Sequence, residues 1–150
     1  MPIIELKTII NSDIETCFNL ARDINLHQKS LEHSKERAIA GRTSGLIELG
    51  ESVTWEAIHF GVKQRLTSII TEFDFPNYFV DEQASGPFES FKHEHIFGKV
   101  SDNQTEMTDL FEFESPRGFL GKFANWLFLK RYMTDLLETR NGALKKFAES

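Results

Sequence analysis

Two histidines, separated by one residue, lie in a segment that reads as a β-strand, residues 88–100. Side chains alternate between the two faces of a strand, so His93 and His95 share a face. Phe91 and Phe97 fall on the same face. Histidine exchanges protons near neutral pH and also ligates metals. The pair could therefore serve acid–base chemistry, ligand binding or metal ligation beside apolar side chains.

An aspartate and a third histidine show the same kind of placement. Asp109 falls on the more apolar face of the segment 104–113, and His59 shares a face with Trp55 in the segment 52–60. An unpaired buried charge is costly, and buried polar groups find hydrogen-bond partners. We therefore expect these polar side chains to meet one another.

Such a cluster permits three roles. In the first, Asp109 holds a ring N–H of His93 or His95 in a structural network that binds nothing. In the second, the polar groups line a mostly apolar pocket and orient an oxygen atom of a ligand. In the third, a histidine moves protons during an aldol-type cyclisation or a dehydration, and Asp109 orients it. The candidate catalytic residues are then His93, His95 and Asp109.

The His-x-His spacing also occurs in metal sites, since it puts two imidazoles on one face about 7 Å apart at Cα. His59 and Asp109 would nominally complete the ligand set. No pattern in the sequence brings these side chains to one ion. We predict no metal site and no other cofactor.

Three further polar residues give weaker signals. Asp81 shares a face with Phe79, but the opposite face of its strand is equally apolar, so alternation does not orient it. It is a weak candidate for the site. His27 and His33 lie in or after a short polar helix and are expected to face solvent without a role.

The elements that must position these residues follow a simple order. Residues 3–10 read as a strand. Ser12 and Glu15 have the spacing of a helix-capping pair, and Asp23 starts a second short helix. Further strands are expected at residues 35–41, 52–60, 62–73, 78–84, 88–100 and 104–113. Short links between the last five favour an antiparallel meander.

The C-terminal segment, residues 119–148, lacks proline and predicts one helix about 45 Å long. Gly142 is its weak point, since glycine destabilises a helix interior. An apolar stripe predicts packing against the sheet. Around Phe128 and Leu129, however, the helix is apolar on all sides. This predicts contact with a ligand at a cavity mouth, with a second subunit in a homodimer, or with a membrane surface.

Composition excludes several classes of function. The net charge of −6 argues against non-specific nucleic-acid binding. A single cysteine, Cys17, gives no disulfide framework, so we expect a cytoplasmic protein. No signal peptide and no transmembrane segment are expected. Motifs for nucleotide-dependent, serine-hydrolase, thiol-redox and zincin chemistry are missing from the sequence.

Several short segments of the sequence are characteristic. They are Gly50-Glu51-Ser52-Val53-Thr54-Trp55, His59-Phe60-Gly61, Pro76-Asn77-Tyr78-Phe79-Val80-Asp81, Gly86-Pro87-Phe88-Glu89-Ser90-Phe91-Lys92-His93-Glu94-His95-Ile96-Phe97 and Thr108-Asp109. With the order of elements, they resemble the START-like or SRPBCC superfamily over nearly the whole chain. The match is to a bacterial branch described as polyketide cyclase/dehydrase-like or cell-division-inhibitor-like. The resemblance implies the α+β helix-grip fold of birch-pollen-allergen-like proteins, a curved antiparallel sheet of six to seven strands around a long C-terminal helix.

The same resemblance implies a cavity between sheet and helix that binds lipids, polyketides or other apolar metabolites. We therefore predict one ligand-binding domain over residues 1–150 that takes a small apolar molecule. A cofactor-free cyclase or dehydratase and a protein-interaction module are the alternatives, because fold does not determine function. The predicted ligand-binding residues are Trp55, His59, Phe91, His93, His95, Phe97, Asp109, Phe111, Phe119 and Phe123, with Asp81 as a weaker candidate.

Overall fold

The computed structural model describes residues 3–114 and 122–150, with side chains from Leu127 onward in the second stretch. The elements are β1 (Ile3–Ile10), α1 (Ile14–Ala21), α2 (Ile24–Ser30), the 3-10 turn η1 (Glu32–Ser34), β2 (Arg37–Gly41), β3 (Ser52–His59), β4 (Val62–Asp74), β5 (Tyr78–Ser85), β6 (Ser90–Ser101), β7 (Gln104–Glu114) and α3 (Lys122–Ala148). The predicted order of elements and the α+β class are confirmed.

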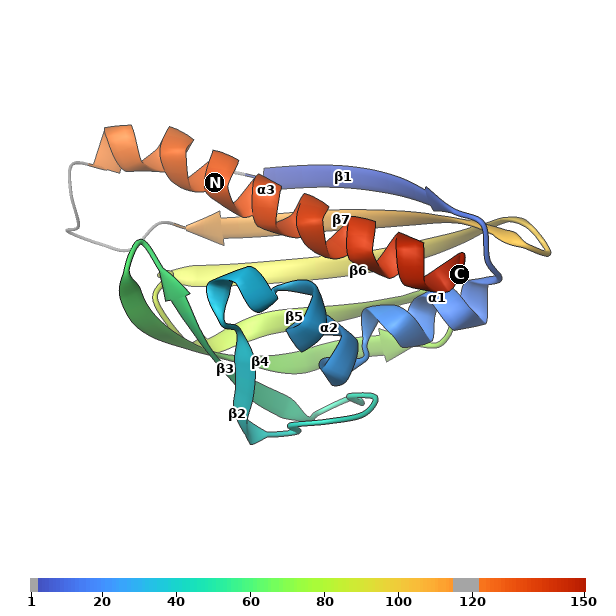
Figure 1. Cartoon of the computed structure of the whole chain (residues 1–150), viewed down its shortest axis with the longest axis horizontal. Helices are drawn as coiled ribbons and strands as arrows, with labels where there is room; N and C mark the ends of the chain where they lie inside the picture. The colour runs from blue at the N-terminus through green and yellow to red at the C-terminus, as the bar shows by residue number, and fades with distance from the viewer. Residues whose placement is uncertain (1–2, 115–121) are drawn as a thin grey trace.

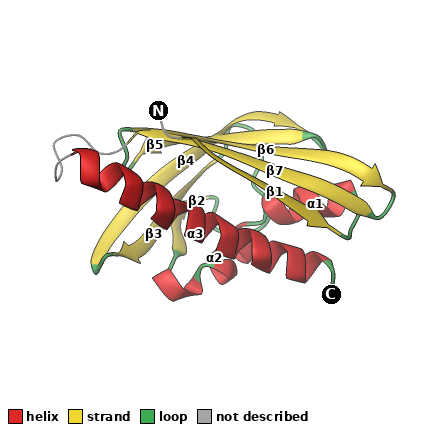
Figure 2. Ribbon diagram, turned by 90° about the horizontal axis from the view of Figure 1, so that it is seen from above, coloured by secondary structure: helices red, strands yellow, loops and turns green. Residues whose placement is uncertain are grey.

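All seven strands form one antiparallel sheet in the order β1-β7-β6-β5-β4-β3-β2. Strands β3 to β7 are neighbours in chain order, as the short turns between them require. Strand β1 pairs with β7 at one edge. The helix α3 crosses the curved sheet diagonally (Figure 1), and the helices α1 and α2 lie on the same side of the sheet as α3 (Figure 2). The site must therefore lie between the sheet and this helical layer.

Alternation along β6 and β7 sorts side chains as the sequence predicts. In β6, the residues Phe91, His93, His95 and Phe97 are all buried. In β7, buried and half-buried residues alternate without a break from Gln104 to Glu114. The register places His95 opposite Asp109. Sheet pairing, and not chance contact, therefore brings the histidines to the aspartate.

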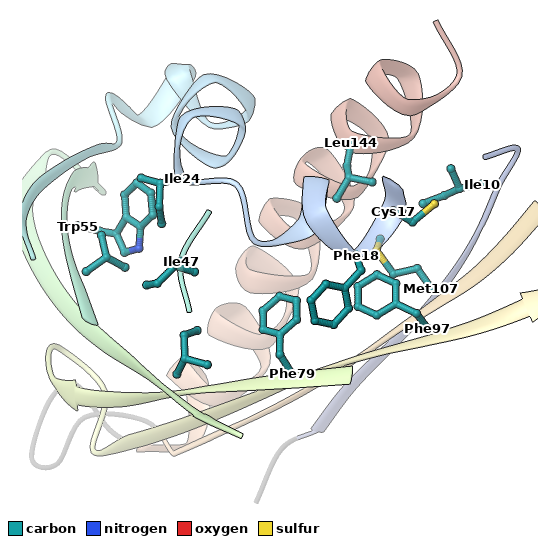
Figure 3. Close-up of a cluster of buried hydrophobic side chains, with 12 residues drawn as sticks. Ile10, Cys17, Phe18, Ile24, Ile47, Trp55, Phe79, Phe97, Met107 and Leu144 are labelled. Atoms are coloured by element: carbon teal, nitrogen blue, oxygen red, sulfur yellow. The ribbon is translucent and has the colours of Figure 1, made fainter. Parts of the chain in front are cut away.

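The apolar core forms two clusters. The larger one surrounds Phe18 of α1, which lies beside Phe79 and Phe97 of the sheet (Figure 3). Their ring centroids are both 5.2 Å from that of Phe18. A second cluster groups Phe91, Phe111 and other residues of the sheet with Leu137 of α3.

Two strands begin two residues later than predicted, while most other strand ends agree to within one residue. Strand β2 begins at Arg37, two residues late, because Lys35 takes a left-handed conformation with a φ of 55° at the end of η1. Strand β6 begins at Ser90, since the chain bends over residues 86–89. The helix α3 continues through Gly142 to Ala148, so this glycine does not end it. Within the described residues, no helix is long and apolar enough to cross a membrane.

Candidate functional site

A cavity of about 780 Å³ lies between the sheet and α3. This volume is within the range of small-molecule sites. Its walls are mainly apolar and include Trp55, Phe88, Phe91, Phe111, Met133 and Leu137. Among the polar side chains of the wall, two hydrogen-bonded groups stand out, one at the inner end and one beside the hairpin that joins β3 to β4.

The inner polar group is centred on the carboxylate of Asp109. Its Oδ1 lies 2.8 Å from Nε2 of His93 and accepts a hydrogen bond of 2.8 Å from Nη2 of Arg140. Its Oδ2 accepts a 2.7 Å bond from Nδ2 of Asn141. Asp109 is completely buried and Arg140 nearly so. Both oxygens of this buried carboxylate therefore have hydrogen-bond partners, three in all.

Opposing effects act on the pKa of Asp109. Burial alone would raise the pKa, because an ionised group loses its hydration. The charge of Arg140 and the hydrogen bond from His93 outweigh burial and hold the pKa of this carboxyl well below its usual range. Asp109 is thus an anion at neutral pH.

The second histidine of the pair faces a different carboxylate. Nε2 of His95 lies 2.7 Å from Oδ1 of Asp81. Its ring stacks between Phe79 and His93, with centroid distances of 4.1 and 3.8 Å. Burial and the neighbouring His93 lower the pKa of His95 to about 4. His95 is therefore neutral at pH 7.

One nitrogen of this ring stays without a hydrogen bond. Nδ1 of His95 is buried and has no partner among the described residues. Oδ1 of Asp109 is 3.6 Å away, beyond a good hydrogen bond. Burial would raise the pKa of Asp81, but the bond from His95 outweighs it and lowers that pKa. Since ionised carboxylates only accept, both histidines present Nε2–H to them, and in the neutral ring of His95 the Nδ1 atom carries the lone pair.

The outer polar group lies at the cavity mouth. Nδ1 of His59 and the hydroxyl of Tyr132 are 2.6 Å apart, and burial lowers the pKa of His59 and raises that of Tyr132. The hairpin between β3 and β4 turns at Phe60 and Gly61 with positive φ at both, as a type I′ turn requires. Phe60 lies over Tyr132 with a centroid distance of 4.5 Å. A positive φ is uncommon for phenylalanine, and the tight two-residue turn requires it here.

His27 corrects one prediction. It does not face solvent without contacts, because its ring lies on Trp55 with a centroid distance of 4.4 Å and lines the cavity. Its Nε2 is 2.8 Å from a carboxylate oxygen of Glu36. Only the packing of α2 over β3 produces this contact. His33 is exposed, as expected.

The predicted site residues divide into four groups. Those in the cavity wall are Trp55, His59, Asp81, Phe91, His93 and Phe111. His95 and Asp109 lie behind the wall and bind its polar members. Phe97 lies outside the wall, packed on Phe18. Phe119 and the side chain of Phe123 lie outside the described residues.

The sequence interpretation missed Arg140 and Asn141, which bind Asp109 from α3. A signal for one of them was present. Arg140 lies three residues after Leu137 and four before Leu144, so helical spacing puts it on the buried stripe of α3. An arginine at such a position predicts a buried carboxylate opposite it.

Phe128 and Leu129 of α3 lie at the cavity, as one of the three predicted contacts, that with a ligand, requires. Phe128 is exposed and lies near Phe60, with a centroid distance of 5.3 Å, while Leu129 packs against the second core cluster. Both line the cavity. Contact with a second subunit or a membrane stays a prediction.

Asp81, His93 and His95 also meet a minimal requirement for a metal site. Each offers one ligand atom, and these atoms lie within 4.8 Å of one another. Both Nε2 atoms, however, already face carboxylates. The two rings are stacked with planes only 27° apart, so their lone pairs do not converge on one point. The arrangement fits a hydrogen-bonded network better than ligation of an ion.

Comparison with known proteins gives similarity in structure alone. No family model matches the sequence, and no curated protein matches it. A crystal structure of a protein from Thermus thermophilus is similar with a TM-score of 0.78 at 18% identity, covering 97% of this chain and 95% of that one. The Zhui aromatase/cyclase from a Streptomyces species has a TM-score of 0.81 at 12% identity, with coverage of 99% and 93%. A START superfamily protein from Mycobacterium smegmatis has a TM-score of 0.75 at 12% identity, with coverage of 98% and 97%. As the resemblance in its sequence predicts, the chain has the START-like helix-grip fold.

Proposed function

We propose that the protein binds a small, largely apolar molecule in the cavity between the sheet and α3. The observation that carries this proposal is the cavity itself, about 780 Å³ with a mainly apolar wall. Protein interiors are close-packed, and empty spaces much larger than one water molecule are few. A space of this size in so small a chain is therefore best understood as a binding site.

The polar groups in the wall support a ligand with some polar character. Asp109 keeps its bonds to His93, Arg140 and Asn141 without a ligand, so the cavity holds no unpaired buried anion that would repel apolar molecules. A few ordered polar groups in an apolar wall are what usually orient a ligand.

The test is native mass spectrometry of freshly purified protein, followed by titration with the neutral dye Nile red. We expect a bound small molecule or uptake of the dye. Ala57→Phe puts a large side chain into the cavity wall and should prevent both. Ile58→Phe, one residue along on the other face of β3, is the control and should have no effect. A protein that carries no ligand and takes up no dye would contradict the proposal.

Acid–base conversion of the bound molecule is a second candidate. His93 lines the cavity, and Asp109 holds its Nε2, which is the arrangement of an oriented general base. Two proteins with similar structures are described as aromatase/cyclases. His93→Gln should abolish conversion of the co-purifying molecule while its binding is retained. Conversion at an unchanged rate would eliminate this candidate and leave a carrier.

A further inference from the structure

One carboxylate in the cavity wall uses only one of its two oxygens. Asp81 lines the cavity and binds Nε2 of His95 through Oδ1. Among the described residues, no hydrogen bond or ion pair involves Oδ2 of Asp81. The buried side-chain atoms that lack a partner in the same part of the chain are Oε1 of Gln83 and Nδ1 of His95. Oδ2 of Asp81 is therefore not sealed inside packed protein.

The exposure of Asp81 indicates where this oxygen points. Asp81 lies in β5, opposite Ile70 of β4 on one side and His93 of β6 on the other. Ile70, His93 and the bound His95 are all buried, yet 19% of the Asp81 side chain is exposed. Since Asp81 lines the cavity, this exposed surface is cavity surface. One end of the carboxylate is thus fixed to the packed interior, and the other end faces the open space.

The charge of Asp81 has no bound cation. Burial would raise its pKa, but the bond from His95 outweighs burial and lowers that pKa, so Asp81 is an anion at neutral pH. His95 is neutral there, because its pKa is lowered to about 4. No lysine or arginine of the described chain forms an ion pair with Asp81. Buried charges in proteins are normally paired, so the wall offers an anion whose counter-ion a ligand can supply.

We propose that Asp81 binds a protonated amine on an otherwise apolar ligand. An ammonium N–H donates to Oδ2, and the positive charge lies beside the carboxylate. The inference rests on the proposed function, binding of a largely apolar molecule in this cavity, and adds the chemical class of the polar group that this molecule carries.

Other polar groups fit Asp81 less well. An ether or a ketone has no hydrogen to donate to a carboxylate. A hydroxyl can donate, but it leaves the negative charge uncompensated. An anionic group is repelled by Asp81, and the arginines of the wall, Arg65 and Arg140, already pair with Glu56 and Asp109. Charge-assisted hydrogen bonds are about twice as strong as neutral ones, so an ammonium gains the most.

A matched set of probes tests the proposal on the whole protein. The probes are 2-naphthylmethylamine, 2-naphthylmethanol, 2-methylnaphthalene and 2-naphthoate, and each is titrated at pH 7 against protein-bound Nile red. Their common ring suits the aromatic residues of the wall, which include Trp55, Phe91 and Phe111. The bond to the carboxylate should make the amine bind about tenfold tighter than the alcohol, or more. The ammonium is the more strongly hydrated group, so the hydrophobic effect alone predicts the opposite order.

Variants assign the effect to Asp81. Asp81→Asn removes the charge, and its amide oxygen can still accept from His95. The amine should then bind no tighter than the alcohol, while 2-methylnaphthalene binds as before. Asp102→Asn is the control, because it makes the same change in net charge at a side chain that is 91% exposed. It should leave all four affinities unchanged. If Asp81→Asn does not fold, as judged by circular dichroism, the series on the unaltered protein still decides the question.

Each alternative result has a definite meaning. An amine that binds no tighter than the alcohol, or that fails to displace the dye, would overturn recognition of an ammonium and leave binding in the cavity intact. Tightest binding of 2-naphthoate would overturn it in favour of an anionic ligand. An equal loss of amine affinity in Asp102→Asn would show attraction by overall charge and overturn the role of Asp81. Failure of Nile red itself to bind would contradict the proposed function.

Discussion

Two carboxylates, Asp109 and Glu56, are almost fully buried on opposite faces of the same sheet, and both are paired with positively charged side chains. Asp109 is 0% exposed and Glu56 is 5% exposed. Arg140, which holds Asp109, has only 7% of its side chain exposed. The cations around Glu56 are Arg37, Lys63 and Arg65, with 62%, 62% and 67% of their side chains exposed.

The difference lies in where the countercharges reside. On the outer face, water and salt solvate the cations and can replace them as partners of the carboxylate, so exposed pairs contribute little. On the inner face, water and salt cannot replace Asp109 or Arg140 as partners, because both side chains are buried. Breaking a pair there leaves an uncompensated buried charge, which is strongly destabilising. Ion pairs of similar composition therefore contribute differently to stability on the two faces of the sheet.

The largest effect is expected from Arg140→Met, which removes the buried cation and retains an apolar stem. Asp109 then stays buried as an anion, and the free energy of unfolding should fall by about 3–5 kcal/mol in urea denaturation. Adding Asp109→Asn should restore much of this loss, because no charge remains buried. A double variant no more stable than Arg140→Met would show that charge is not the cause.

The pH dependence of stability tests the inner face in a second way. The unfolded chain protonates His95 near its ordinary pKa of 6.5, whereas burial and His93 keep the folded pKa at about 4. Stability from this residue is therefore complete above about pH 6.5 and is lost as the pH falls to about 4, by at most about 3 kcal/mol.

Urea denaturation across this pH window measures that contribution, and His95→Gln is the comparison because the amide can still donate to Asp81. The variant should show a flatter pH profile than the wild type. If the wild type instead gains stability relative to the variant as the pH falls, then His95 takes up a proton between Asp81 and Asp109 in the folded state, and the sign of its pKa shift is reversed.

The cavity mouth provides an intermediate case. The bond between His59 and Tyr132 is half-buried, so Tyr132→Phe should lower the free energy of unfolding by about 1 kcal/mol, the usual net value of one hydrogen bond. Thermal unfolding of the two proteins side by side measures it. A loss as large as that of Arg140→Met would mean that the mouth is energetically part of the inner cluster.

The smallest effect is expected at Glu56. The pKa of Glu56 lies below its ordinary value because of hydrogen bonds from Arg37 and Arg65, but both partners are exposed. Glu56→Gln should change stability only slightly, and high salt should remove the difference by screening. A large, salt-independent loss would abolish the contrast between the two faces.

Much of this site was predictable because a strand repeats every two residues. That period placed His93, His95 and Asp109 on buried faces, and the cost of burying polar groups predicted that they would meet one another. Asp81 could not be oriented in this way, since Tyr78 and Val80 make its other face apolar too. The register shift between Ile70 and Glu72 of the neighbouring strand further disturbs a simple alternation.

The positions of other residues depended on which helices pack over the sheet. Phe97 was expected in the ligand site, but α1 brings Phe18 onto it and makes it core. His27 was expected in solvent, but α2 lays it on Trp55. In each case a helix covers one end of the sheet, and no local pattern specifies which end.

The sequence by itself determined the order of elements, the faces of β6 and β7, and the need for a partner to Asp109, because these follow from local periodicity and the cost of burying charge. Only the tertiary structure decided that Arg140 and Asn141, 31 and 32 residues further along the chain, meet that need. It also decided that the space between sheet and helix stays open, since an unfilled volume depends on how distant surfaces fit together.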